Sequence, residues 1–489
     1  MLNPTTRQTP TSEPMDGRSG NLPAGQTGAA LIVMLLILVI GVASLFTSKL
    51  AKRNNANLRV QQQATLLADA KQALLGYAVT HYDSNPGEYG YLPCPDIDTS
   101  GPTFEGEAHA NACGAQYTTA IGRLPWKTLG LEPATADGAE CIWYAVSGSH
   151  KDAIGAKAEM LNADSNGLLQ IFAENGTTAI AGANPDERAV AVLIAPGRTL
   201  PGQTRTPLGG GVNQCSGNYA PANYLDADNG INNAAVSGLP DSLDQFIARG
   251  NEASVNDQIL FITRNEIEQQ LTRRIDTQTN LEALTQAVAE CIADYGKKNP
   301  GGASDMRLPW PAPLNLSDYR ADAQYDDTAL GLLSGRVPDA VDDSNTQTLN
   351  TISNAVSGCS SVDVPAWTPE MAVLWANWKD HLFIAIADAF KPDAPTPTAC
   401  GTCLTVNGGS NYAAVVMLSG RRLTALGQPR NAPPLDPDTK NNISNYLEGR
   451  NASNHPNLAG DGDYQSAAAT TTFNDVLFCI DPSMSVNPC

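Results

Sequence analysis

The chain has 489 residues, and 50 acidic side chains against 30 basic ones give it a formal net charge of −20. At roughly 150 residues per domain, this length predicts two or three domains, each large enough to bury a core. The acidic balance excludes nucleic acid as a partner and disfavours anionic lipid head groups, because both attract clusters of Lys and Arg. With 42% hydrophobic residues, the chain is also too apolar for a disordered acidic protein.

The first segment with a structural signal is apolar and lies near the N-terminus. Residues 1–28 are polar, whereas Ala29–Phe46 contains eighteen residues without a charge, which as a helix would rise about 27 Å and cross most of a bilayer core. The polar leader is too long for an ordinary secretory signal, and the apolar run continues into a helical pattern from Leu58 to Tyr77. We therefore expect residues 29–82 to form a transmembrane and emergent α-helix.

The junction between leader and apolar run resembles a known processing signal. Gln26-Thr27-Gly28 is followed at once by Ala29-Ala30-Leu31-Ile32-Val33, which looks like the class III signal of type IV pilins and type II secretion pseudopilins. Further on, Ala68–Ala78, Tyr91–Asp96 and Gly122–Trp126 are similar to a group of pilin-like proteins. The resemblance implies that residues 1–28 are a prepilin-type leader, and that a prepilin peptidase cuts after Gly28 and methylates Ala29.

One position departs from the family pattern. Most pilins carry Glu at the fifth mature position, which here is Val33. A carboxylate in lipid is costly unless it is paired, so in the family this Glu serves to register a subunit against its neighbour. Its absence disfavours a bulk fibre subunit and favours a rare capping subunit with a large head.

The charges around the apolar run do not by themselves set the topology. Lys49, Lys52 and Arg53 follow the run, while Arg7 and Arg18 in the leader are offset by acidic residues, so the positive-inside rule alone would not place the leader in the cytoplasm. Following the resemblance, we expect a single-pass protein of the bacterial inner membrane. Its head would lie in the periplasm or at the tip of an extracytoplasmic fibre.

The remainder of the chain is an internal repeat. Five segments of the first half recur in the same order in the second half. The matched pairs are 73–77 with 289–295, 92–95 with 308–311, 191–205 with 415–430, 223–225 with 445–447, and 256–261 with 474–478. This order predicts a tandem duplication, with head lobe 1 over residues 83–275 and head lobe 2 over residues 276–489.

Each copy begins with a helix and continues with apolar runs typical of buried strands. The runs are Ala189–Ile194 and Ile259–Thr263 in copy one, and Ala413–Leu418 and Val476–Ile480 in copy two. The second copy supplies its own soluble helix at about 280–296. We therefore expect an α+β fold, in which a long N-terminal transmembrane helix leads into a two-lobed head of antiparallel strands packed on helices.

Ten cysteines, none in the first 93 residues, are compatible with disulfides formed in an oxidising compartment, and inert buried thiols are the alternative. We expect Cys94 to pair with Cys113, and Cys479 with Cys489. Cys400 and Cys403 form a CxxC pair, but its flanks predict a loop entering a strand rather than the helix start of a redox motif. These two are expected to be structural half-cystines, bonded to each other or to Cys359.

Calcium is the one cofactor that the sequence suggests. Asp96 and Asp98 follow the first LPCP turn, and Asp226 and Asp228 alternate before Gly230, which can place several oxygen ligands on one side of a turn. The alternative is that these residues are ordinary turn formers in solvated loops. If calcium binds, it should raise the melting temperature of the head.

Other candidate sites have competing structural explanations. Arg198 and Arg421 each follow Gly in matched segments and could bind a carboxylate partner, although a structural salt bridge in each lobe is the commoner role of such an Arg. Trp367, Trp375 and Trp378 suggest core or a lobe interface, with an exposed partner patch as the minority interpretation.

The chain contains neither an HExxH nor a GxSxG motif, although a catalytic triad can assemble in space without a motif. We therefore expect no enzyme, and the leading hypothesis is a minor pilin or pseudopilin that acts as a low-copy tip or priming subunit of a type IV pilus or type II secretion pseudopilus. Its expected partners are prepilin peptidase, other pilins or pseudopilins, the inner-membrane assembly platform and an exported substrate. The alternatives are a membrane-anchored adhesin or substrate-binding protein with a duplicated head, and a tethered periplasmic hydrolase.

Overall fold

The computed structural model describes most of the chain from residue 60 onward. The described residues are 60–97, 104–110, 113–133, 135–136, 140–206, 214–215, 217–248, 254–298, 306–329, 331–341, 355–394, 400, 403–455 and 462–489. The processing residues Gly28 and Ala29, the fifth mature position Val33 and the acidic residue Asp98 lie outside them. The chain divides into two compact units, Met1–Gln61 and Gln62–Cys489, and the features below belong to the second unit.

The predicted N-terminal transmembrane helix is not shown, and the fold class and the location are corrected accordingly. Among the described residues, no helix has the length and apolar character needed to span a bilayer. Ala29–Phe46 lies outside them. Of the helix predicted over residues 29–82, the structure describes only the part from residue 60, in a helix that ends at residue 84. This helix is amphipathic, with Leu67, Ala70 and Leu74 buried and the polar residues between them largely exposed. The structure therefore gives no support to a single-pass inner-membrane protein with a long N-terminal helix.

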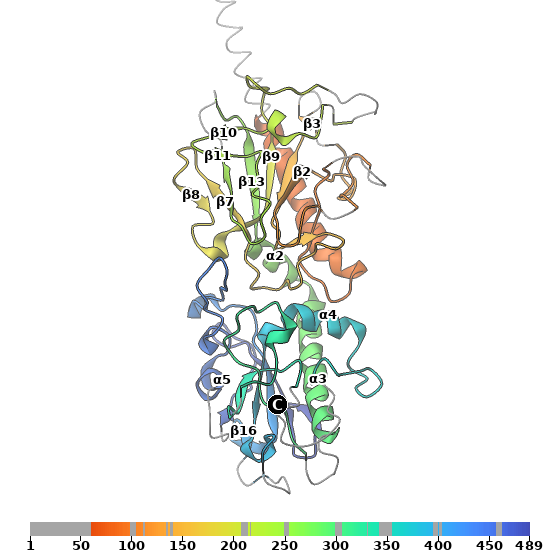
Figure 1. The fold of residues 1–489 in the computed structure, drawn as a ribbon, viewed down its shortest axis with the longest axis vertical. Helices are drawn as coiled ribbons and strands as arrows, with labels where there is room; N and C mark the ends of the chain where they lie inside the picture. Colours follow the sequence, from red (N-terminus) through yellow and green to blue (C-terminus); the bar gives the residue numbers. More distant parts are fainter. Residues whose placement is uncertain are drawn as a thin grey trace, which may run out of the picture. The chain divides into compact units, whose positions relative to one another are not determined.

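Lobe 1, as we call residues 62–274, packs this helix against an antiparallel sheet (Figure 1). The sheet has the order β2 (Ala120–Arg123), β5 (Trp143–Val146), β9 (Ala189–Ala195) and β13 (Gln258–Thr263). Strand β9 is buried along its whole length because side chains cover both faces of the sheet. The helix covers one face, where Leu74 belongs to the same core as Leu193, and Trp143 and Phe246 form a second core with Val192.

A smaller group of strands extends the sheet of lobe 1. Strand β7 (Leu169–Phe172) pairs antiparallel with β8 (Ala179–Ala181) and parallel with β12 (Asp244–Ile247), and it joins β9 at one residue pair. The remaining pairs are short: β1 (Leu92–Pro93) with β6 (Lys151–Asp152), β3 (Thr135–Ala136) with β4 (Glu140–Cys141), and β10 (Ala227–Asp228) with β11 (Ile231–Asn232). The lobe ends with helix α2 (Arg264–Leu271), whose N-terminus is closed by a capping box of Thr263 and Glu266.

Lobe 2, residues 275–489, repeats this plan. Helix α3 (Ile275–Lys298) packs on a sheet of order β14 (Ser334–Arg336), β15 (Leu382–Ile386), β18 (Ala414–Leu418), β20 (Val476–Ile480) and β21 (Val486–Pro488). Beside it, β16 (Leu404–Val406) pairs antiparallel with β17 (Gly409–Tyr412) and parallel with β19 (Asp463–Tyr464), as β7 pairs with β8 and β12. Two short helices complete the lobe, α4 (Pro369–Trp378) and α5 (Gly449–Asn454).

A Gly–Arg step shows how closely the two lobes correspond. Gly122 and Gly335 lie where a Cβ atom would come within 2.6 Å of the Asp96 carbonyl and 2.3 Å of the Ala312 carbonyl, respectively. Each glycine thus lets a strand approach the residue that follows an LPxP turn. The Arg after each glycine forms a backbone bridge to that residue, Arg123 to Asp96 and Arg336 to Ala312. The same close approach therefore recurs in both lobes, although the Gly follows the turn by 27 residues in lobe 1 (122 − 95) and by 24 in lobe 2 (335 − 311).

Five disulfides join all ten cysteines. The pairs are Cys94–Cys113, Cys141–Cys215, Cys291–Cys359, Cys400–Cys403 and Cys479–Cys489. The first and last are pairs that the spacing suggested, and Cys400 bonds to Cys403 rather than to Cys359.

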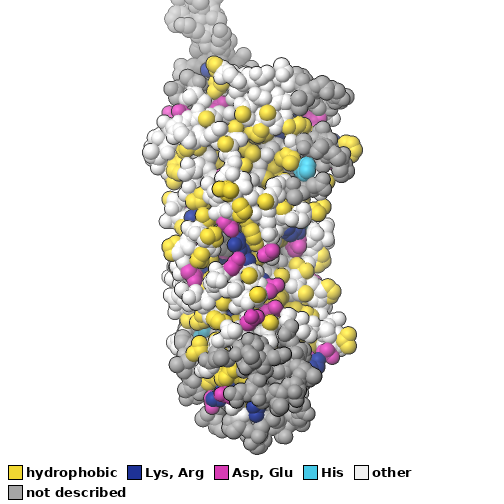
Figure 2. Space-filling view, in the orientation of Figure 1, with side chains coloured by type: hydrophobic (Ala, Val, Ile, Leu, Met, Phe, Trp, Pro, Cys, Tyr) yellow, Lys and Arg dark blue, Asp and Glu magenta, His cyan; other side chains and the backbone are white. Residues whose placement is uncertain are grey.

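On the face drawn in Figure 2, apolar side chains are scattered among polar ones, and acidic and basic side chains intermingle.

Candidate functional site

Buried polar residues in lobe 1 form a closed hydrogen-bond network around Asp226. The Asp226 carboxylate accepts hydrogen bonds from Gln203 Nε2 at 2.8 Å and from the Asn256 backbone N–H at 2.7 Å. The Asp226 backbone N–H donates in turn to Asp257 Oδ2 at 2.8 Å. Two carboxyl groups therefore tie the loop before β10 to the start of β13.

The same network recurs in lobe 2 with the matching residues. Glu448 accepts from Gln428 Nε2 at 2.8 Å and from the Asn474 backbone N–H at 3.0 Å. Its own N–H donates to Asp475 Oδ2 at 3.0 Å. A network present in both copies, each time closed on protein partners, has a structural role in the lobe.

Burial of Asp257 and Asp475 favours their uncharged forms. Burial raises the pKa of Asp257 to about 7, and the nearby Asp226 carboxylate adds to the rise. Burial likewise raises the pKa of Asp475 well above its ordinary value, with Glu448 contributing in the same direction. One oxygen of each acid, Asp257 Oδ1 and Asp475 Oδ1, has no hydrogen-bond partner, but a calcium site needs ionised carboxylates, and the raised pKa values of these two acids disfavour that form.

The other expected calcium ligands also have protein partners. Asp228 accepts hydrogen bonds from the Asn229 N–H at 2.9 Å and from Ser254 Oγ at 3.0 Å. Asp96 is fully buried, and its Oδ2 accepts from the Gly106 N–H at 2.8 Å and from the Tyr219 hydroxyl at 3.3 Å. Burial raises the pKa of Asp96 to about 7. Within the described ranges, Asp96, Asp226 and Asp228 belong to no group of three metal-type ligands, and Asp98 lies outside those ranges.

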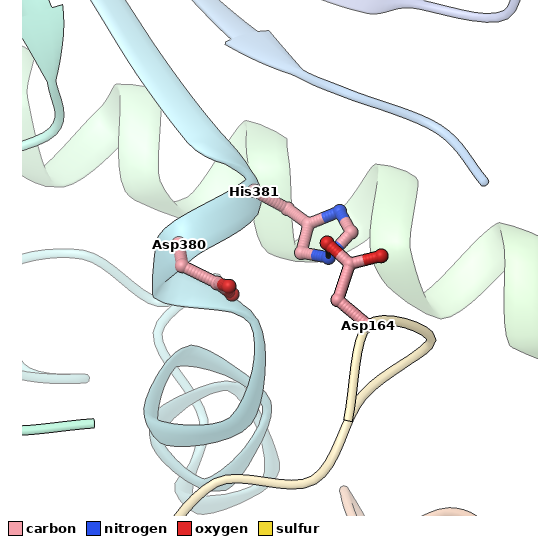
Figure 3. Close-up of side chains that lie close together, drawn as sticks. All are labelled: Asp164, Asp380 and His381. Atoms are coloured by element: carbon pink, nitrogen blue, oxygen red, sulfur yellow. Dashed lines mark ion pairs between the residues drawn. The ribbon is translucent and has the colours of Figure 1, made fainter. Parts of the chain in front are cut away.

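The one such group that the described residues form lies between the two lobes (Figure 3). Asp164 comes from a loop of lobe 1, whereas Asp380 and His381 come from the 3₁₀ helix Lys379–His381 that enters β15. Asp164 Oδ2 lies 3.0 Å from His381 Nε2. Asn162 Nδ2 donates to Asp380 Oδ1 at 2.8 Å, so both acids take part in contacts that cross between the lobes.

Cationic side chains fill the rest of this inter-lobe cluster. Asp164 Oδ1 lies 3.1 Å from Arg422 Nε and 3.7 Å from Arg430 Nη1, and Asp380 Oδ2 lies 2.5 Å from Lys440 Nζ. Burial works to raise the pKa of Asp164, but His381, Arg430 and Arg422 hold it well below its ordinary value. Because three fixed cations already neutralise the two carboxylates, the cluster does not suit a further metal cation.

The cluster also contains the components of a catalytic triad. Ser419 Oγ lies 3.1 Å from His381 Nδ1, opposite the nitrogen that faces Asp164. All three side chains are buried, and Asp164 is shared with Arg422 and Arg430. In a working triad the carboxylate stabilises the imidazolium that forms as Ser loses its proton, whereas here two guanidinium groups compete for it. The arrangement therefore fits a polar joint between the lobes better than a nucleophile and its base.

Sequence reasoning missed this joint because its members come from different copies of the repeat. Asp164 and His381 are 217 positions apart (381 − 164), and neither belongs to a matched segment. A second cross-lobe pair, Arg188 with Asp436 at 2.7 Å, is also buried. Only the packing of one lobe against the other brings these charges together.

The remaining predicted residues separate into core and surface. Trp367, Trp375 and Trp378 all belong to the main core of lobe 2, and Trp375 Nε1 donates to Asp339 Oδ1 at 2.9 Å. The matched arginines Arg198 and Arg421 are exposed, and neither side chain forms an ion pair or hydrogen bond with another described residue. The salt bridge expected of them is therefore not observed.

Two other arginine pairs carry the repeated structural roles. Arg205 and Arg430 donate to the backbone carbonyls of Asn223 and Asn445. Arg123 and Arg336 follow the glycines of the Gly–Arg step and stack against Tyr224 and Tyr446, respectively. Arg123 lies in the segment Gly122–Trp126 that resembles pilin-like proteins. Its counterpart in lobe 2, Arg336, was not predicted, because the two segments share only the dipeptide Gly-Arg.

A cavity with a volume of about 550 Å³ adjoins the inter-lobe cluster. Helix α2, the first turns of α3 and the end of β18 contribute to its walls. Ser419 and Arg421 line it, so the cavity lies against the joint described above. No protein-family model, curated protein or solved structure matches the chain.

Proposed function

We propose that the chain is a non-enzymatic pilin-like subunit, acting as a low-copy tip or priming component of a type IV pilus or a type II secretion pseudopilus. The observation that carries this proposal is the helix-on-sheet unit that heads the described chain. Helix 60–84 follows the segment that resembles a prepilin signal, and it buries Leu67, Ala70 and Leu74 against an antiparallel sheet.

The size of the head supports a low copy number. Residues 62–489 form one compact unit made of two helix-on-sheet lobes, so each subunit would add twice the bulk of a one-lobed head. Subunits of this bulk would clash if they were repeated at the close spacing of a fibre. The fifth mature position holds Val33 instead of Glu, which agrees with a subunit that needs no neighbour on one side.

The polar chemistry of the head supports a role without catalysis. Its buried acids are engaged by protein donors or cations, including those of the inter-lobe cluster. The expected partners are prepilin peptidase and other pilin-like subunits.

Fibre composition tests this proposal. Fibres are sheared from cells that make the chain together with its pilin-like partners, and each subunit is quantified by mass spectrometry. We expect the chain to be present at a small fraction of the most abundant subunit. A chain absent from the fibres would contradict assembly, and one equal in amount to the main subunit would contradict the tip position.

A further inference from the structure

The cavity between the lobes combines apolar walls with two arginines that form no ion pair with a described residue. Apolar side chains from both lobes line it, among them Leu161, Ile267, Leu271, Leu281, Leu418 and Leu423. At about 550 Å³, it falls within the range of sites that enclose small molecules, which are mostly apolar with a few directed polar groups. The two arginines in its wall are Arg264 from lobe 1 and Arg421 from lobe 2.

Arg264 is a buried cation that makes no ion pair with a described acid, although Asp164, Glu268 and Asp186 lie near enough to stabilise its charge. Its side chain is 4% exposed, and its two donor contacts go to neutral amides, Asn166 Oδ1 at 2.9 Å and Asn265 Oδ1 at 3.2 Å. Its Nε is buried and has no hydrogen-bond partner. Burying a guanidinium without an anion is costly, so this position gains from an anionic ligand.

Arg421 gives the cavity a second cation from the opposite lobe. Its guanidinium is exposed and makes no ion pair with another described residue, while its backbone carbonyl accepts from Asn474 Nδ2 at 2.8 Å. That backbone contact holds the residue at the end of β18, directly after Ser419 and Gly420 in the cavity wall. The side chain is thus placed to bind a ligand without losing an existing partner.

Three acids line the same cavity, and they do not cancel the two arginines. Glu282 is exposed near the start of α3, and Asp475 is buried beside Glu448 with a pKa raised well above its ordinary value. Glu268, one turn after Arg264 on α2, is half-buried, and burial raises its pKa although Arg264, Arg422 and Arg421 oppose the rise. Arg274, the other cation of the wall, is already paired with Asp83 and Asp276.

We propose that this inter-lobe cavity binds a small monocarboxylate with an apolar body. The carboxylate would bind Arg421 and Arg264, and the apolar body would lie against the leucines and Ile267. A fatty acid and the C-terminus of a short apolar peptide share this chemistry. The proposal does not depend on assembly into a fibre, and its failure would leave the proposed function untouched.

Calorimetric titration of the full-length chain tests the proposal. The probes are dodecanoate below its micellar concentration, dodecanol as its neutral analogue, N-acetyl-Leu-Leu, and the amide of that peptide. We expect one site per chain for at least one carboxylate, and binding of its neutral analogue weaker by about tenfold or more, because the neutral analogue cannot form charge-assisted hydrogen bonds to the arginines. The tighter of the two acids identifies the source of the ligand.

The repeat supplies a matched control. Arg421→Gln should weaken binding of the carboxylate by about tenfold or more, whereas Arg198→Gln, the equivalent change at an exposed Arg outside the cavity, should leave it unchanged. Both positions are exposed, so both variants should fold. Equal binding of acid and neutral analogue, unchanged binding in Arg421→Gln, or no binding of any probe would overturn the proposal.

Discussion

Asp164 is the side chain that joins the charges of the two lobes. It faces His381, Arg422 and Arg430, and all of its carboxylate contacts cross from lobe 1 to lobe 2. The cations hold the pKa of Asp164 in the folded chain well below its ordinary value of 3.8. The stabilisation from this carboxylate is therefore complete above pH 3.8, and it is lost as the pH falls from 3.8 to the lower pKa of the folded chain. The joint should therefore be intact at neutral pH.

Replacing Asp164 tests this role. Asp164→Asn would leave buried cations without a counter-charge, which typically costs about 3–5 kcal/mol of unfolding free energy. Denaturant unfolding followed by circular dichroism should show a clearly lower midpoint than that of the parent chain. Asp363→Asn is the control, because Asp363 pairs with Lys298 on the surface, and its midpoint should not move. A parental midpoint for Asp164→Asn would show that the cluster does not hold the lobes.

At the scale of single residues, the sequence predicted covalent pairs better than charged ones. Cys94 with Cys113 and Cys479 with Cys489 close short loops, so their spacing indicated the partners. Asp226 and Asp228 matched an alternating calcium pattern, but the pattern could not show that Gln203 and Asn256 already bind the Asp226 oxygens. Arg264 was not singled out because the burial of a cation without an ion pair is visible only in three dimensions.

At the scale of elements, periodicity and repetition located the sheet. The apolar runs predicted at 189–194 and 476–480 correspond to β9 and β20, since fully buried strands read as continuous apolar segments. The short strands β16 and β19 were not predicted, because two or three residues carry no alternation. The helix predicted over 29–82 is described only from residue 60, and apolar composition alone could not establish the rest.

The duplicated acid networks predict how stability depends on pH. The pKa of Asp257 is raised to about 7 in the folded chain, so between its ordinary value and 7 the unfolded chain binds fewer protons, and stability falls as the pH rises. Each unit of pKa difference is worth about 1.4 kcal/mol. Between pH 5 and pH 8, the unfolding free energy of Asp257→Asn should therefore fall by roughly 2–3 kcal/mol less than that of the parent chain.

Thermal melts at these two pH values provide the measurement. The fall in melting temperature from pH 5 to pH 8 should be smaller in Asp257→Asn than in the parent chain. Asp475→Asn changes the matching residue of lobe 2, whose pKa is also raised, and should act in the same direction. If both variants keep the parental pH dependence, the paired acids do not titrate as inferred.

At the scale of the whole molecule, two lobes of one plan form a single compact unit over residues 62–489. Cross-lobe pairs such as Arg188 with Asp436 and Arg320 with Asp241 support this unity. These pairs join the two lobes, and the cavity with walls from both lobes lies at the same junction.

The most direct test of the pilin-like proposal is the intact mass of the full-length chain after expression with and without a prepilin peptidase. We predict that the peptidase removes residues 1–28 and leaves a chain that begins at Ala29, with or without a methyl group. Gly28→Gln should block the cut, whereas Gly25→Gln, three residues upstream, should not. A chain that stays uncut with the peptidase, or that is cut at another position, would contradict the proposal.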